Sequence, residues 1–354
     1  MKQFTVLWLV SWLACVSGCA GRAIDLDRSA PPSGTAGAVD IGVPVETAPV
    51  RSALAYFWAD DSRIYWNLPL SAGHGSNYGC VFDRCASTTL SYGESDARPS
   101  YWMLLVGDDI LFNSSENTVV RCPKTGCVGA PTQVSSGGFR AAASDASYLY
   151  WNADDNIYRC SVENCGDIPE LVARRVEADD LHVQGGNLYW ASPSDANAWL
   201  LSAPSDGSQT PTAIVRRDAD GVPSIDPNGG QVQAFTLDSE RVYWLDTDSQ
   251  VRACSLHGCQ PDEPSVITTD GEGKGGLVAD ATGLYWIGGE NVVRYCPSAG
   301  CKAGSAPKDV STTRTFDDFQ ITPNYVYWSQ STPTDPNEVP LWLIYRTPKP
   351  NQNQ

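Results

Sequence analysis

Gly-Leu-Val-Ala-Asp-Ala-Thr-Gly-Leu-Tyr-Trp, residues 276–286, is the stretch that decides the fold. It joins a short apolar run, an aspartate, a tight-turn sequence and an aliphatic-Tyr-Trp triplet. Residues 292–296 (Val-Val-Arg-Tyr-Cys) follow after a polar gap, and Cys301 completes a Cys-x4-Cys spacing. Copies of such a unit along one chain indicate a repeat architecture.

The unit recurs along the whole chain. Six copies of the aliphatic-Tyr-Trp triplet end at Trp66, Trp151, Trp190, Trp244, Trp286 and Trp328, and an altered seventh copy is predicted at Leu111-Phe112-Asn113. A spacing of about 40 residues suits four-stranded propeller blades or two-helix solenoids. The segments are short, rich in Val, Ile, Tyr and Trp, and bounded by turn residues, which favours strands. We therefore predict an all-β, seven-bladed β-propeller of four-stranded blades over residues 40–347.

The two aromatic residues of each triplet have a packing role in this architecture. Strands are expected at residues 277–280, 284–287, 292–296 and 308–312. Alternate side chains of a strand face opposite ways, so Tyr285 and Trp286 should pack against the two neighbouring blades. An aromatic ligand cage is the alternative interpretation of the pair.

The last repeat supplies three strands, so the ring needs a fourth strand from elsewhere. Residues 41–47 (Ile-Gly-Val-Pro-Val-Glu-Thr) resemble the outer strands of other repeats. We predict that they pair with residues 341–345, which closes the ring and removes two open edges. Residues 348–354 are then a C-terminal tail.

The N-terminus has the pattern of a bacterial export signal. Residues 1–18 contain an apolar core that is too short to cross a bilayer as a stable helix. Val-Ser-Gly-Cys at 16–19 resembles a lipobox, which implies a mature chain lipidated at Cys19; an ordinary signal peptide is the alternative. By resemblance to enterobacterial sorting, Ala20 favours the outer membrane, facing either the periplasm or the surface. Residues 19–39 are small and polar, as in a flexible tether.

The other cysteines, apart from Cys15 in the signal, share one spacing. They form the Cys-x4-Cys pairs Cys80/Cys85, Cys122/Cys127, Cys160/Cys165, Cys254/Cys259 and Cys296/Cys301. This spacing fits disulfides that close the hairpin between the third and fourth strands of a blade, each contributing about 2 kcal/mol. The cysteine content also indicates an oxidising compartment. Zinc is the alternative, but pairs on separate blades could not share one ion.

Charge narrows the range of partners. The chain carries a formal net charge of −17, with 41 acidic and 24 basic residues. Nucleic acids and anionic lipid surfaces are therefore disfavoured as partners. A closed ring needs no second chain to cover its edges, so a monomer is expected.

Acidic residues gather in the loops that follow second strands or connect blades, which lie on one face of a propeller. They are Asp154, Asp155, Asp179, Asp180, Asp246, Asp248, Asp270, Glu272, Asp317 and Asp318. If they converge on the central channel they could bind Ca2+, with candidate ligands Asp246, Asp248, Asp270 and Glu272. Solvated acidic loops without a bound metal or cofactor are the favoured interpretation.

Catalytic signatures are scarce in the sequence. The three histidines are His74 in a long loop, His182 on an expected inner strand and His257 inside a Cys-x4-Cys turn. No Gly-x-Ser-x-Gly, His-Glu-x-x-His or phosphate-binding loop is present. The favoured interpretation has no catalytic residue; the alternative is a calcium-dependent lactonase or esterase that uses His182, Asp179 and Asp180.

The repeated pattern resembles two families. Aliphatic-Tyr-Trp, a gap, and Ile/Val-x-Arg before an outer strand are similar to the YWTD repeats of low-density-lipoprotein-receptor propellers. Bacterial propeller lipoproteins with Tyr-Trp and Cys-x4-Cys repeats are a closer resemblance. The resemblance implies a propeller over residues 40–347. Together with the long loops 67–79, 216–233 and 329–340, it suggests a non-enzymatic binding or scaffold module for a protein or glycan partner.

Overall fold

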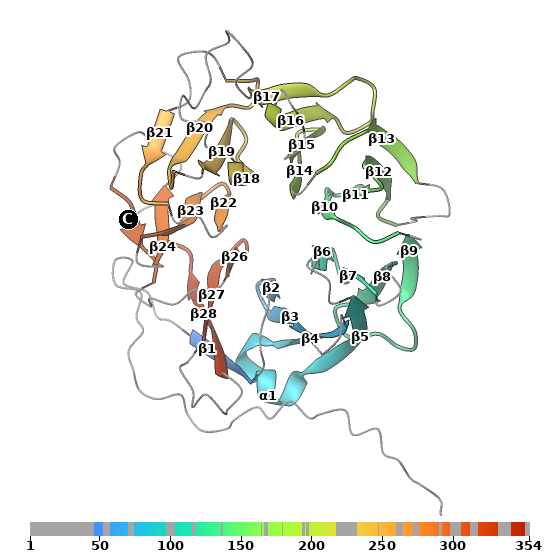
Figure 1. Ribbon diagram of the computed structural model, residues 1–354. Coiled ribbons are helices and arrows are strands. Elements are labelled where there is room, and N and C mark those ends of the chain that lie inside the picture. The colour runs from blue at the N-terminus through green and yellow to red at the C-terminus, as the bar shows by residue number, and fades with distance from the viewer. Residues whose placement is uncertain are drawn as a thin grey trace, which may run out of the picture.

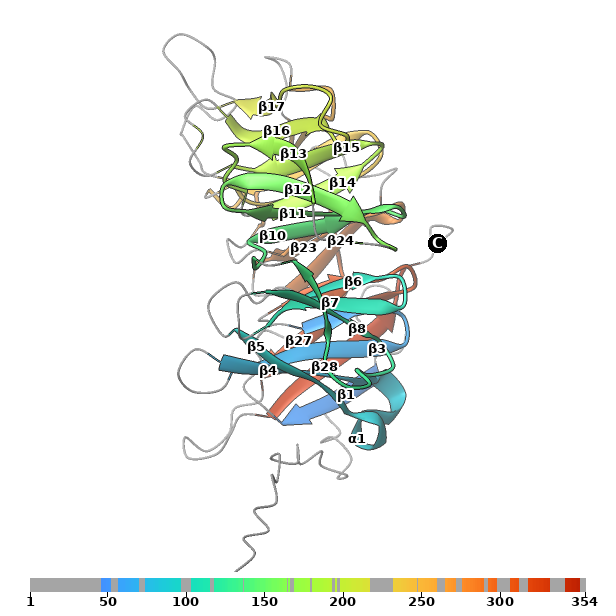
Figure 2. The same cartoon turned by 90° about the vertical axis from the view of Figure 1, so that its right-hand side faces the viewer.

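The chain forms a ring of β-sheets around a central axis (Figure 1). The computed structural model describes residues 46–51, 57–69, 74–96, 103–114, 118–135, 137–163, 165, 169–178, 180–192, 195, 198–216, 232–246, 248–259, 265–271, 276–289, 292–297, 306–311, 318–331 and 341–350. Within these ranges, 28 strands form seven antiparallel sheets of four strands each. Figure 2 shows the ring from the side, as a disc that contains a single layer of blades. The predicted seven-bladed β-propeller is therefore confirmed.

Each blade is numbered in chain order, with its strands running from the centre outward. Blade 1 contains β2 (Phe57–Ala59), β3 (Arg63–Pro69), β4 (His74–Val81) and β5 (Leu90–Asp96). Blade 2 contains β6 (Met103–Val106), β7 (Asp109–Asn113), β8 (Val119–Pro123) and β9 (Thr132–Ser135). Blade 3 contains β10 (Ala141–Ser144), β11 (Tyr148–Ala153), β12 (Asn156–Ser161) and β13 (Glu170–Arg174). The helical residues described are η1 (Phe82–Arg84) and α1 (Cys85–Thr88), both in blade 1.

The remaining four blades complete the ring. Blade 4 contains β14 (Asp180–Gln184), β15 (Asn187–Ala191), β16 (Ala198–Pro204) and β17 (Thr212–Arg216). Blade 5 contains β18 (Val232–Leu237), β19 (Arg241–Asp246), β20 (Val251–Ser255) and β21 (Ser265–Thr268). Blade 6 contains β22 (Leu277–Ala279), β23 (Gly283–Gly288), β24 (Val292–Pro297) and β25 (Lys308–Asp309). Blade 7 contains β26 (Phe319–Ile321), β27 (Tyr325–Ser331), β28 (Leu341–Pro348) and β1 (Glu46–Arg51).

An N-terminal strand closes the ring, although not the segment that the sequence suggested. Strand β1 pairs antiparallel with β28 from Glu46 opposite Arg346 to Arg51 opposite Leu341, as Figure 1 shows for the blue and red strands. The partner was predicted correctly, but the register pairs residues 47–51, not 41–47, with residues 341–345; residues 41–45 lie outside the described residues. The strand includes Pro49, which lacks an N–H, and β1 accommodates it because it is the outermost strand of its sheet.

The Tyr and Trp of each triplet pack on opposite sides of a blade, as predicted. Tyr285 belongs to an apolar cluster with Phe319 and Trp328 of blade 7. Trp286 belongs to a different cluster, with Tyr243 and other residues of blade 5. Both side chains are fully buried, at 0% and 1% exposed. The aromatic pairs therefore join successive blades. Because both rings of this pair are buried, neither can form part of a ligand cage.

The altered repeat forms a complete blade, but its register differs by one residue from the prediction. Cys122 pairs with Ile110 across strands β8 and β7, just as Cys80 pairs with Ile64 in blade 1. The true copy of the triplet is therefore Ile110-Leu111-Phe112. The predicted alignment matched Phe112 to Tyr by its chemistry, whereas the pairing places it at the buried Trp position.

Four disulfides lie where the spacing predicted them. The bonded pairs are Cys80–Cys85, Cys122–Cys127, Cys160–Cys165 and Cys254–Cys259. In each pair the first cysteine lies on the third strand of a blade, and the second lies in the connection to the fourth strand. Cys296 is also disulfide-bonded, and Cys301 lies outside the described residues. Each link closes a small loop at the same end of its hairpin.

The predictions for the N-terminal segment concern residues that the structure does not describe. Residues 1–18, Cys19 and the tether 19–39 all lie outside the described ranges. In the part of the chain that is described, no helix has the length and apolar character required to cross a membrane.

Candidate functional site

Most of the repeated aspartates have a structural task at the turn before the second strand. Three of them accept a hydrogen bond from the tyrosine hydroxyl of the same repeat: Asp60 from Tyr65 at 3.1 Å, Asp145 from Tyr150 at 2.9 Å and Asp238 from Tyr243 at 2.7 Å. The other carboxylate oxygen of each accepts backbone N–H groups of the turn. The recurring aspartate therefore fixes the hairpin turn to the inter-blade core.

The pKa of these carboxyl groups reflects this bonding. Burial would raise the pKa of Asp145, but the N–H groups of Ser147 and Tyr148 and the hydroxyl of Tyr150 bind its charged form and lower it. The pKa of Asp60 is lowered in the same way, again against burial, by turn N–H groups and by Lys124. Their partners, including Tyr243, have a raised pKa because burial disfavours the phenolate.

The alternative catalytic constellation forms only in part. His182 and Asp180 lie two residues apart on β14, with the His182 Nε2 atom 3.3 Å from Asp180 Oδ2. The His182 ring also meets the buried ring of Phe235 of blade 5, edge to face at 4.6 Å. Asp179 lies outside the described residues. In the seven inner strands as described, Asp180 and His182 are the only ionisable residues.

Protonation of His182 is favoured by its partners. Burial of the imidazole opposes the charged form, but the Asp180 carboxylate and a hydrogen bond with the Phe235 backbone raise the pKa of His182 above its ordinary value. The other two histidines lie elsewhere: His74 begins β4, and the exposed His257 lies in the disulfide turn after β20. The geometry is that of a histidine–carboxylate pair at a blade interface.

Two candidate calcium ligands are engaged with arginines. Asp246 is 1% exposed; its Oδ2 atom accepts a 2.8 Å hydrogen bond from Arg252 Nε, and its Oδ1 atom accepts two backbone N–H groups. Asp270 Oδ2 lies 3.0 Å from Arg294 Nε. Asp248 is exposed, and Glu272 lies outside the described residues. No three His, Cys, Asp or Glu side chains of the described residues are placed to hold a metal ion together.

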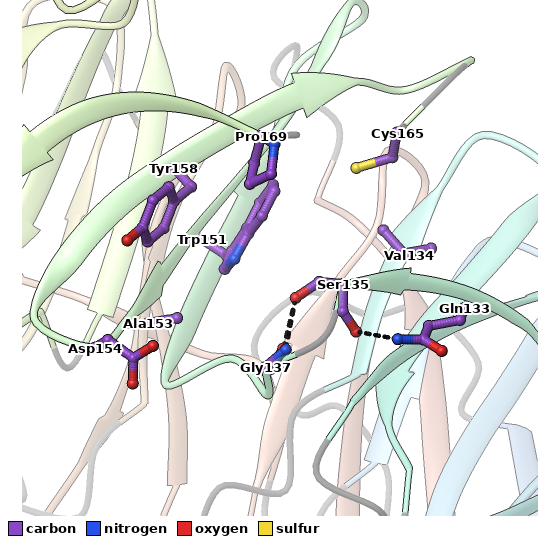
Figure 3. A pocket seen from close by; sticks show the side chains of 10 residues that line it. All are labelled: Gln133, Val134, Ser135, Gly137, Trp151, Ala153, Asp154, Tyr158, Cys165 and Pro169. Carbon is purple, nitrogen blue, oxygen red and sulfur yellow. Dashed lines mark hydrogen bonds between the residues drawn. The ribbon is translucent and has the colours of Figure 1, made fainter. Parts of the chain in front are cut away.

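A cavity of about 450 Å³ opens between blades 2 and 3. It is lined by Gln133, Val134, Ser135, Gly137, Trp151, Ala153, Asp154, Tyr158, Cys165 and Pro169. Figure 3 shows Tyr158, Trp151 and Asp154 of blade 3 across the space from Gln133, Val134 and Ser135 of blade 2. The volume falls within the range of about 300–1,000 Å³ that is usual for small-molecule sites. None of the motifs in the sequence marks this site.

One aromatic ring is accessible in the cavity and a second supports it. Trp151 is 2% exposed, whereas Tyr158 is only partly buried. The two rings lie 6.0 Å apart, centroid to centroid, at an interplanar angle of 31°. Tyr158 pairs with Trp151 across β12 and β11, and Tyr78 pairs with Trp66 at the equivalent position of blade 1.

Strand length explains why the space beside Tyr158 is open. In blade 2 the outer strand β9 has four residues and ends at Ser135. Blade 7, which precedes blade 1, has the longer, six-residue outer strand β1, and Tyr78 packs against a cluster that includes Ile344 of the adjoining β28. The short β9 segment Thr-Gln-Val-Ser was the only signal in the sequence. It lies about 20 residues before Tyr158 and in a different blade, so the cavity could not be predicted from either segment alone.

Hydrogen bonds hold the blade 2 wall of the cavity. The Ser135 hydroxyl donates to the Gly137 carbonyl at 2.6 Å and accepts the Gly137 N–H at 3.1 Å. The Gln133 side-chain amide donates to the Ser135 carbonyl at 3.3 Å. On the other side, Asp154 has φ of +49° in the two-residue turn between β11 and β12. A turn of this kind suits aspartate and projects its carboxylate at the rim.

The similarity of this chain to known proteins is confined to the fold. No protein-family model and no curated protein matches the sequence. The computationally designed Ika8 protein is similar over 83% of this chain and 84% of its own, with 10% identity and a TM-score of 0.50. BamB from Moraxella catarrhalis matches with 14% identity, 83% coverage of each chain and a TM-score of 0.48. A chain of a nidogen/laminin complex matches with 16% identity, coverage of 70% of this chain and 91% of that one, and a TM-score of 0.42.

Proposed function

We propose that the chain is a non-enzymatic binding module that presents a rigid propeller to a protein or glycan partner. The cavity between blades 2 and 3 is the observation that carries this proposal. Its lining combines an accessible aromatic ring with a few polar groups, among them the Gln133 amide and the Asp154 carboxylate, as binding sites commonly do. Ser135 uses its hydroxyl to hold Gly137, and the Cys165 sulfur is in a disulfide, so neither is prepared to act as a nucleophile.

The proposal includes attachment to a bacterial cell envelope. The lipobox-like sequence at 16–19 supports lipidation of Cys19, and the four disulfides among the described residues suit an oxidising compartment. Incorporation of labelled palmitate into the wild type, and its loss in Cys19→Ala, is the expected result. Equal labelling of both proteins would overturn the lipid anchor without bearing on the propeller.

Site-specific photo-crosslinking in the envelope tests the binding function. One variant carries the crosslinker at Gln133 in the cavity, and a matched control carries it at Val128, which is fully exposed directly after the Cys122–Cys127 disulfide. We expect adducts of defined mass from position 133 and none from 128. Equal adducts from both positions, or none from 133, would contradict a binding module that uses this cavity.

The second candidate is a calcium-dependent lactonase or esterase. The observation in its favour is the Asp180–His182 pair, which supplies the only ionisable groups of the described inner strands. Turnover of a lactone and ester panel that is abolished in His182→Ala, with calcium required, would establish it. Equal rates for wild type and His182→Ala would remove it.

A further inference from the structure

The cavity between blades 2 and 3 has a chemistry that selects among ligand classes. Its blade 3 side offers the Tyr158 ring and the Asp154 carboxylate, and its blade 2 side offers the Gln133 amide, as Figure 3 shows. The carboxylate of Asp154 makes no hydrogen bond to the described residues, although its backbone carbonyl accepts one from Asn156. The Gln133 amide uses one donor on Ser135 and has its carbonyl oxygen as a further acceptor.

Charge and polarity exclude three ligand classes from this cavity. An anion would meet Asp154 on a chain of net charge −17. A fully apolar ligand would offer no hydrogen-bonding partner to the Gln133 amide or the Asp154 carboxylate. Quaternary ammonium ligands are typically held in a cage of several aromatic rings, and here Trp151 is 2% exposed, so the Tyr158 ring alone is available. A neutral polar ligand with one apolar face satisfies all of these conditions.

We infer that this cavity binds a neutral saccharide. The apolar C–H face of one pyranose ring packs on Tyr158, whose ring lies 6.0 Å from that of Trp151, centroid to centroid. Sugar hydroxyls donate to the Asp154 carboxylate and exchange hydrogen bonds with the Gln133 amide. Because the two sides come from different blades, the ligand bridges β9 and β12. This inference rests on the proposed binding function and specifies its ligand class.

The test uses the full chain with its disulfides formed, in detergent. Chitotriose, cellotriose and maltotriose are titrated by calorimetry and by saturation-transfer NMR, with choline and inorganic phosphate as charged comparators. We expect at least one trisaccharide to bind and neither comparator to do so. Tyr158→Ala should weaken binding about tenfold, and Tyr158→Phe should retain it, because the ring face makes the contact.

Two matched controls separate the site from general stability. Tyr78→Ala removes the equivalent tyrosine of blade 1 and should leave the affinity unchanged. Asp154→Asn should weaken binding about threefold, whereas Asp155→Asn, at the adjacent turn position with φ of +56°, should not. Asparagine tolerates this backbone conformation, so both aspartate variants should fold even if Tyr158→Ala does not.

The contrary outcomes are distinct. Absence of binding by all three trisaccharides, or binding that is equal in wild type, Tyr158→Ala and Asp154→Asn, overturns the saccharide site. Binding of choline in preference to sugars also overturns it, in favour of a cation site. If crosslinks persist at position 133 in these cases, the binding function stands with another ligand; if they are also absent, both proposals fail.

Discussion

The Arg346 guanidinium of the last blade lies 2.7 Å from the Asp83 carboxylate of the first blade and covers the ring of Phe82 at 4.2 Å. The same guanidinium lies 4.6 Å from the Tyr325 ring centroid. The Tyr327 hydroxyl adds a 2.9 Å hydrogen bond to the Asp60 carbonyl. Side chains therefore reinforce the joint at which the ring is closed.

Arg346→Ala should lower the free energy of unfolding by about 2 kcal/mol, because the side chain is 6% exposed and packs on two aromatic rings. Asp83→Asn should change it by less than about 0.5 kcal/mol, since Asp83 is 65% exposed and the ion pair is screened. Urea denaturation of both variants measures the difference. A loss in Asp83→Asn as large as that in Arg346→Ala would show that the ion pair, not the ring packing, carries the stabilisation.

The repeated aspartates predict sensitivity to acid. The pKa values of Asp60, Asp145 and Asp280 are lowered in the folded state, so their contribution to stability is complete above the unfolded value of 3.8 and is lost as the pH falls through the lower folded values. The melting temperature should therefore decline below about pH 4. Asp145→Asn should melt lower than wild type at pH 7 and show a shallower decline. A parallel pH profile for the two proteins would contradict this assignment.

Gly283 in the fold-deciding stretch should not tolerate a side chain. A Cβ atom there would lie 2.2 Å from the Cys296 carbonyl oxygen, where backbone cannot move aside. Gly283→Ala should lower the stability by more than about 2 kcal/mol. Gly137→Ala is the control, because a Cβ at Gly137 meets nothing within 4 Å. Similar melting temperatures for the two variants would refute the predicted clash.

Calcium should have little effect on the described acidic loops. Asp246 and Asp270 are paired with Arg252 and Arg294, so a cation would have to displace a guanidinium. We expect the melting temperature with millimolar Ca2+ to equal that with EDTA. An increase with Ca2+ would indicate a site. Asp246→Asn and Asp248→Asn would then distinguish a site at that loop from one elsewhere.

Repetition made the architecture predictable from sequence, while details that depend on one blade meeting another were less predictable. Six Tyr-Trp pairs identified the blades because each pair must bury both faces. The blade 2 repeat lacks the Trp that marks the register in the other repeats. Its register became clear only from the strand pairing of Cys122 with Ile110, which places Phe112 at the Trp position. The closing strand was predicted at 41–47 because that segment resembles the outer strands of other repeats. The register instead pairs residues 47–51 with 341–345, and the outermost strand tolerates Pro49.

The candidate sites were less accessible to sequence reasoning. Asp180 and His182 were correctly associated because they share one strand face at a spacing of two. Nothing in the sequence indicated that the ring of Phe235, which belongs to the next blade, packs against His182. The cavity beside Tyr158 depends on the early end of β9 in a different repeat, a relation that no single motif records.

The pairing of Glu46 with Arg346 has a consequence for how the chain folds. These partners are separated by 300 positions (346 − 46), close to the largest separation that the ring allows. A growing chain presents β1 about 300 residues before its partner β28, so closure must wait until β28 has been synthesised. Such non-local pairing raises the contact order and slows folding. Until then β1 has no β28 with which to pair, and the unfinished ring has open edges that other strands can join.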